Sequence, residues 1–154
     1  MTRRETQRQR RSAARLYAVQ ALFQMEAAGQ SAESVITEFQ AHRIGIDSGD
    51  ETLAEADPDL FRSLVAEAVT LQGRIDQMTD RALVEKWPIA RIDPTLRALF
   101  RAAGAELLAQ DAPPRVVISE FVDVARAFFP EGREPGFVNA VLDHMAREAR
   151  PEAF

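Results

Sequence analysis

The sequence predicts an all-α fold, a compact bundle of six or seven helices. Apolar residues recur at intervals of three and four positions along nearly the whole chain, which is the spacing of an amphipathic helix. Alternation with period two never continues long enough to form a strand, and Asp57-Pro58 and Asp93-Pro94 each place proline directly after a helix-capping residue. With 154 residues, 46% of them hydrophobic, we expect residues 1–154 to form a single domain with a substantial core.

The first third of the chain predicts two helices and a long loop. A first helix from about residue 8 to residue 28 places its apolar residues on one face, and Gly29 ends it. A second helix follows the capping residue Ser31 and runs to about residue 42. Residues 43–57 are acidic and rich in turn-forming residues, so we expect an exposed loop there.

The middle of the chain predicts three helices. One begins at Pro58, and Gly73 divides it from a shorter helix that ends at Trp87-Pro88. Another begins at Pro94 and carries a clear apolar stripe up to the break at Pro113-Pro114.

Two further helices complete the expected fold. The segment from about residue 115 to residue 129 is apolar over a wide arc, which is typical of a central helix. Its first residues are β-branched and would also suit a strand, but the apolar residues continue at helical spacing. A loop at 130–136 precedes the last helix.

Six arginines and one glutamate lie within the first fifteen residues. This basic arm, residues 1–15, carries a net charge of +5, whereas the whole chain carries −5, so the remaining residues carry −10. A basic arm on an acidic body indicates a polyanionic partner. On a helical wheel Arg4, Arg8, Arg11 and Arg15 fall within roughly 60° of one another and form one stripe, if the helix begins that early.

The position of the arginines strengthens this interpretation. Each cation near a helix N-terminus opposes the helix dipole at a cost of roughly 0.3–1 kcal/mol. We therefore expect an external anion to neutralise the arginines of the basic arm. We also expect the arm to be mobile until that anion binds. The alternative is an ordinary solvated terminus. An Arg-rich targeting peptide is not expected, because the segment continues into an apolar helix without a cleavage site.

The rest of the composition argues against catalysis. The chain has no cysteine, which excludes disulfides and thiolate metal sites, and its two histidines, His42 and His144, are far apart in sequence. It has no phosphate-binding loop and no metal-binding histidine pair, and carboxylate pairs such as Glu120 and Asp123 are typical of solvated helix faces. No apolar stretch approaches the ~20 residues of a membrane span. We expect a cytoplasmic protein that is not an enzyme and has no metal or cofactor.

Four segments of the chain carry a family resemblance. They are residues 11–23, 99–107, 114–125 and 137–143. In content, order and spacing they resemble the NusB family of bacterial transcription antitermination factors over nearly the whole chain. The segment that begins with Phe137-Val138-Asn139 is the most specific of the four.

The resemblance implies a fold of two small helical bundles and a function in transcription. A protein of this kind binds boxA RNA in nascent ribosomal transcripts as a heterodimer with the ribosomal protein NusE, and couples that RNA to RNA polymerase. The family's RNA contacts match Arg10, Arg11 and Arg15 in the basic arm, together with the aromatic residues Phe23 and Phe137. The charge pattern adds Arg4 and Arg8 to this candidate set. Core packing would also explain the two phenylalanines, and Arg101 and Glu106 are expected to brace the fold.

Two other functions stay open at this level. A NusB-like domain also precedes the catalytic domain of ribosomal-RNA cytosine methyltransferases, although this sequence contains no cofactor-binding sheet. The acidic body could instead bind a basic protein partner, with the arm playing no part. The sequence also leaves open which surface meets NusE, whether the free protein is a monomer or a homodimer, and which RNA sequence is preferred.

Overall fold

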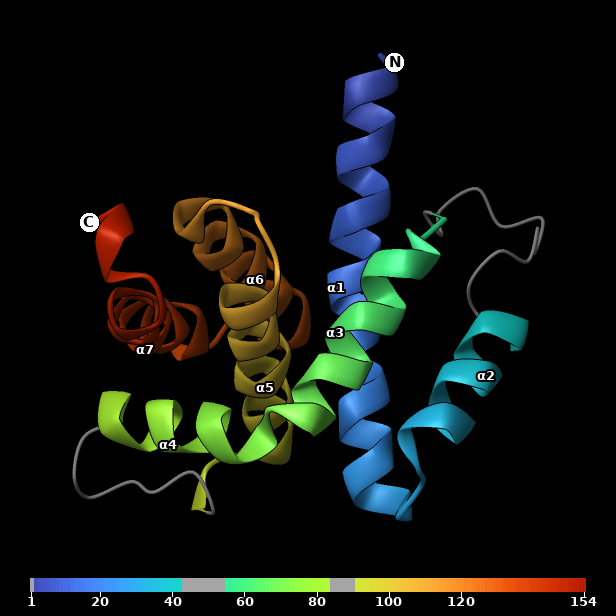
Figure 1. Cartoon of the computed structure of the whole chain (residues 1–154), viewed down its shortest axis with the longest axis horizontal. Helices are drawn as coiled ribbons and strands as arrows, with labels where there is room; N and C mark the ends of the chain where they lie inside the picture. Colours follow the sequence, from blue (N-terminus) through green and yellow to red (C-terminus); the bar gives the residue numbers. More distant parts are fainter. Residues whose placement is uncertain (1, 43–54, 84–90) are drawn as a thin grey trace.

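The computed structural model describes residues 2–42, 55–83 and 91–154, and every secondary-structure element in these ranges is a helix. Most of the expected acidic loop at 43–57 and the expected helix end at Trp87-Pro88 lie outside the described residues. In chain order the elements are α1 (Arg3–Ala28), α2 (Ala32–His42), α3 (Pro58–Thr70), α4 (Gln72–Ala82), α5 (Pro94–Ala109), α6 (Pro114–Phe128), α7 (Glu134–Ala149) and the short 3-10 helix η2 (Pro151–Ala153). The predicted all-α class is confirmed (Figure 1).

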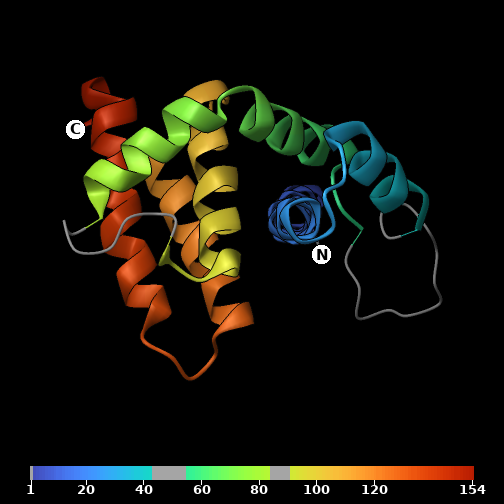
Figure 2. The ribbon, with the colours of Figure 1, turned by 90° about the horizontal axis from the view of Figure 1, so that it is seen from below.

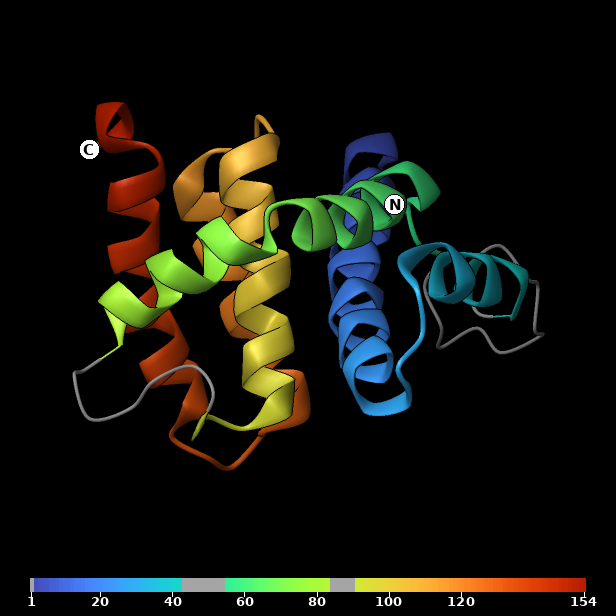
Figure 3. The same cartoon turned by 60° about the horizontal axis from the view of Figure 1, so that its bottom comes forward.

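The helices form two groups, and the boundary between the groups runs between α1 and α5. α1, α2 and α3 pack on one another, as do α4, α5, α6 and α7, and the contact between α1 and α5 joins the two groups. Figure 3 shows α3 and α4 following each other across the front of α1 and α5. Aromatic rings fill the smaller group, where Phe39 stacks on Phe61 at 5.6 Å between ring centroids and meets the edge of Tyr17 at 6.5 Å.

Local sequence signals explain several helix ends. Gly29 ends α1 in the left-handed conformation with φ 69°, as glycine after a helix often does. The Asp57 side chain accepts from the N–H groups of Asp59 and Leu60 at 3.0 Å each, and the Asp93 side chain accepts from Thr95 N–H at 2.7 Å. Both predicted Asp-Pro helix starts are therefore confirmed.

Four helix boundaries differ from those expected. α4 already ends at Ala82, where Leu83 turns to an extended conformation with φ −76° and ψ 147°, and α7 begins at Glu134, inside the expected loop at 130–136. The other two concern α1 and the break between α3 and α4.

α1 begins at Arg3 and not near residue 8, because Thr2 and Glu5 form a capping box at its N-terminus. The break between α3 and α4 lies at Leu71, with φ −102° and ψ 12°, so Gly73 lies inside α4. None of the described helices is long and apolar enough to cross a membrane.

Candidate nucleic-acid interface

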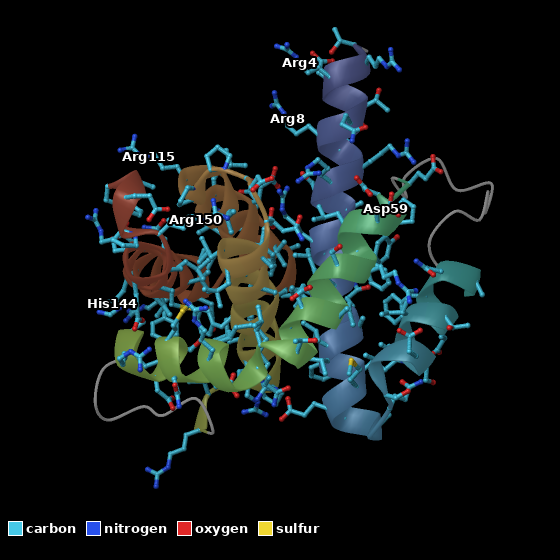
Figure 4. The ribbon with its side chains drawn as sticks, in the orientation of Figure 1. Arg4, Arg8, Asp59, Arg115, His144 and Arg150 are labelled. Carbon is cyan, nitrogen blue, oxygen red and sulfur yellow. The ribbon has the colours of Figure 1, made fainter. Side chains whose placement is uncertain are left out.

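The free end of α1 carries three exposed arginines. Arg3, Arg4 and Arg8 are exposed and make no ion pair with any residue in the described ranges. Figure 4 shows Arg4 and Arg8 pointing toward the side of α1 on which α5, α6 and α7 lie, while Arg115 projects from the first turn of α6. α1 extends past the ends of its neighbours here, so these guanidinium groups stand in solvent (Figure 1).

Arg10 and Arg11 lie one turn further along and are partly neutralised by the fold. Arg10 is 3.6 Å from the Glu55 carboxylate and Arg11 is 4.0 Å from that of Asp57, with about a third of each arginine side chain exposed. The Asp57 backbone N–H also donates to the Arg10 carbonyl at 2.9 Å, which fixes the start of α3 against α1. Both ion pairs are long and partly solvated, so each contributes little stability and could be exchanged for a phosphate.

Arg15 lies in the interior, which contradicts its expected place on an outward-facing stripe. Its side chain is 2% exposed, and Nε and Nη2 donate to the two carboxylate oxygens of Glu106 at 2.7 Å each. Nη1 lies 3.4 Å from Glu120, which also accepts from the Ser12 hydroxyl at 2.8 Å. A guanidinium held in this way is not available to a ligand. If it turned away from Glu106, the Glu106 carboxylate would remain buried without a partner, which is strongly destabilising.

The pKa of Arg15 is consistent with this interior role. Burial alone would lower it, but the hydrogen bond and charge of Glu106, together with the charge of Glu120, outweigh burial, and the pKa is raised. Arg15 therefore stays charged and serves to hold α1 against α5 and α6. The expected role of Glu106 as a brace of the fold agrees with this arrangement.

A groove lies further along α1, where Phe23 is 40% exposed. Its volume is about 390 Å³, and its walls come from α1, α2, α5 and α6. The residues lining it are Val19, Gln20, Phe23, Gln24, Ala27, Ala28, Phe39, Thr95 and Phe128. Figure 2 shows α1 end-on, with α3 on one side and no described helix over the opposite side.

The two predicted aromatic residues do not share this groove. Phe137 is half-buried at the start of α7, where its ring meets the edge of Phe100 at 6.2 Å between centroids, and it does not line the groove. The other phenylalanines that line the groove with Phe23 are Phe39 and Phe128. Sequence reasoning assigned Phe128 to the core, because it continues the apolar arc of its helix, and no signal in one sequence distinguishes a core ring from a groove wall.

Comparison with known proteins places this arrangement in a family. The model of the NusB family matches residues 12–147. The chain is 51% identical to the transcription antitermination protein NusB of Maricaulis maris, with 94% of this chain and 90% of that protein aligned. It is 47% identical to the protein of the same name from Agrobacterium fabrum, with 93% and 87% aligned.

Solved structures share the fold. NusB of T. maritima superposes with a TM-score of 0.72 at 29% identity, covering 93% of this chain and 95% of that one. A crystal structure of the antitermination factors NusB and NusE in complex with dsRNA superposes with a TM-score of 0.73, covering 89% of this chain and 96% of that one. At 22% identity the second likeness concerns the fold alone. These matches confirm the resemblance carried by the four sequence segments, and the chain belongs to the NusB family of transcription antitermination factors, which are not enzymes.

Proposed function

We propose that this protein binds single-stranded boxA RNA of nascent ribosomal transcripts together with NusE, and couples that RNA to RNA polymerase. The observation that carries the RNA part of the proposal is the set of exposed arginines at the free end of α1, which form no ion pair with any described residue, in an otherwise acidic chain. Family membership and the NusB–NusE–RNA assembly of a protein with the same fold support it.

The proposed path of the RNA follows the uncovered side of α1. Arg4 and Arg8 bind phosphates, and the strand continues to Phe23, which lies about 22 Å from Arg8 along the helix at 1.5 Å per residue. Bases stack on the exposed Phe23 ring, a contact that contributes roughly 1–3 kcal/mol per base. Arg10 and Arg11 join by exchanging their carboxylate partners for phosphate, and Phe137 offers a further apolar contact at the start of α7. Because Arg15 is buried, it is not among the proposed RNA contacts.

The partner interactions of the proposal rest on charge and family. Outside the basic arm the chain carries −10, which suits a basic ribosomal protein such as NusE. We take residues 1–154 as one RNA-binding domain that acts in the cytoplasm, in a complex with transcribing RNA polymerase. Whether the free protein is a monomer or a homodimer is answered by its sedimentation equilibrium. The two antitermination proteins reported above align with this chain over 90% and 87% of their own length. They give no support to the methyltransferase alternative.

The experiment separates RNA binding from partner binding. Arg4→Ala/Arg8→Ala should lose most affinity for a boxA oligoribonucleotide and keep its affinity for NusE, because neither side chain contacts the folded body. Arg15 has no place in this test, since its loss would disturb the fold. The matched control is Arg62→Ala, an exposed arginine of α3 whose side chain is 52% accessible and pairs with Glu33. If the double variant kept full RNA affinity, or lost NusE to the same extent, the protein-interaction function would be favoured.

A further inference from the structure

Phe128 lines the groove together with Phe23, and its ring is not packed against another ring. It is the last residue of α6 and is half-buried. Neither Phe23 nor Phe128 makes a ring contact with an aromatic residue in the described ranges, whereas Phe39, the third phenylalanine of the groove, is buried and stacks on Phe61. Phe23 and Phe128 therefore line one groove from two helices without packing on each other.

Contacts between α1 and α6 hold the two sides of the groove in place. The Ser12 hydroxyl on α1 donates to the Glu120 carboxylate on α6 at 2.8 Å, and Arg15 Nη1 lies 3.4 Å from the same carboxylate. Val124, one turn before Phe128, is buried and anchors the last turn of α6. A site whose walls are already fixed loses less conformational freedom when a ligand binds, which favours binding.

The lining of the groove indicates what could enter it. Most lining side chains are apolar and none is charged, so a phosphate would meet no cation there. At about 390 Å³ the groove lies near the small end of the roughly 300–1,000 Å³ typical of small-molecule sites. None of its walls comes from α3, and Figure 2 shows no described helix over the side of α1 opposite α3. A strand that follows α1 can therefore place a flat, uncharged base in the groove.

We propose that Phe128 is a second stacking residue of the RNA site: one nucleobase enters the groove between Phe23 and Phe128 and has an aromatic ring on each face. This inference rests on the proposed RNA-binding function and adds a residue of α6 to it. A base enclosed in this way is separated from its neighbours in the strand, so it must be unpaired and unstacked at that position. Unpaired bases of single-stranded RNA are commonly recognised by stacking on aromatic side chains.

The test uses Phe128→Leu, which keeps an apolar side chain at the wall of the groove and removes the aromatic face. Affinity for a boxA oligoribonucleotide should fall about tenfold, as expected for the loss of one contact between a base and a ring. Phe128→Tyr keeps the aromatic face and should bind within about twofold of wild type. Phe129→Leu is the matched control, because Phe129 is also half-buried but does not line the groove. That variant should lower the melting temperature and leave RNA affinity unchanged.

An RNA that lacks the enclosed base distinguishes stacking from a structural effect. An abasic site introduced at each position in turn should reveal one position at which wild type, Phe23→Leu and Phe128→Leu bind equally, because both rings have lost the same base. With intact RNA, the two substitutions combined should weaken binding by less than the product of their separate effects, since the two side chains share one contact partner.

The other outcomes are distinct from one another. Unchanged RNA affinity in Phe128→Leu, or an equal loss in Phe129→Leu, overturns the inference while the proposed function stands. A loss in Phe128→Leu that persists at every abasic position shows a structural role and also overturns it. Reduced NusE affinity with unchanged RNA affinity assigns the groove to the protein partner, with the same consequence. If wild type fails to bind the RNA, the proposed function fails and the inference fails with it.

Discussion

Arg15 and Glu106 form a two-pronged ion pair in the interior of the protein, with both N–O distances at 2.7 Å. Neither side chain exceeds 2% exposure, and the two residues are 91 positions apart in sequence. The Glu106 carbonyl also accepts from Arg150 Nη2 at 3.0 Å, so one residue of α5 connects α1 to the end of α7. The orientation of α1, and with it the basic arm and the groove, therefore depends on a buried charge pair.

Glu106→Gln should destabilise the protein by about 3–5 kcal/mol, because it leaves the buried Arg15 guanidinium without its counter-charge. The measurement is urea unfolding followed by circular dichroism. Arg126→Ala, which removes an exposed pair with Asp123 whose side chains are 63% and 65% accessible, should cost less than about 1 kcal/mol. Similar losses in the two variants would show that the interior pair contributes no more than a surface one.

The fold class was predictable from the sequence because its determinants are local. Apolar spacing and capping residues act within a few positions, so the Asp57 and Asp93 helix starts and the Gly29 helix end could be identified without tertiary information. The early start of α1 was predictable in the same way, since Thr2 and Glu5 have the spacing of a capping box.

The candidate site was less predictable because its chemistry depends on distant residues. Helical spacing places Arg15 on the same stripe as Arg4 and Arg8. Only the tertiary structure, which brings Glu106 of α5 against Arg15, shows that Arg15 is a buried brace and not a solvent-exposed cation. The same limit applies to Phe137 and Phe128, because their surroundings depend on how α7 packs against α5 and how α6 packs against α1. Gln20 lies among apolar residues, and only the packed structure shows that its side-chain oxygen is buried without a hydrogen-bond partner among the described residues.

Gly104→Ala should destabilise the protein by about 1–3 kcal/mol, because an added Cβ would lie 2.5 Å from Cγ2 of the buried Ile75. Ile75 is β-branched and fully buried, so it cannot move away easily. Gly73→Ala, also within a helix but with no atom within 4 Å of the added Cβ, should raise stability by roughly 0.4–1 kcal/mol. Thermal unfolding of both variants tests the close packing of α4 on α5, and a neutral Gly104→Ala would contradict it.

The basic arm should become more protected when RNA binds. The capping box holds the first turn of α1, yet the arginines of that turn repel one another, so amide hydrogen exchange over residues 3–8 should be fast in the free protein and slower in the complex. Thr2→Ala should speed exchange in the free protein, since the loss of such a cap costs about 0.5–2 kcal/mol. Equal exchange rates with and without RNA would contradict the proposal that RNA binding stabilises the basic arm.

Phe23→Ala should weaken RNA binding by roughly 1–3 kcal/mol, the contribution of one stacked base, with little loss of stability because the ring is 40% exposed. Phe154→Ala is the matched control, since that ring is 45% exposed and contacts Arg147 on α7. Fluorescence anisotropy with a boxA oligoribonucleotide measures both variants. Phe23→Tyr keeps the aromatic face and should bind close to wild type. A loss of affinity in Phe154→Ala equal to that in Phe23→Ala would remove the case for stacking at the groove.

Salt should weaken RNA binding in proportion to the number of arginines that contact phosphate. Arg4, Arg8, Arg10 and Arg11 are the four proposed phosphate contacts, so a plot of log K against log salt concentration should have a slope near −3, at about −0.7 per contact for single strands. Arg8→Ala should make that slope less negative by about 0.7. Arg62→Ala changes the net charge by the same amount, but its guanidinium already pairs with Glu33, so the slope should not change. Equal shifts in both variants would mean that RNA responds to the total charge of the protein, and the specific role of the α1 arginines would be lost.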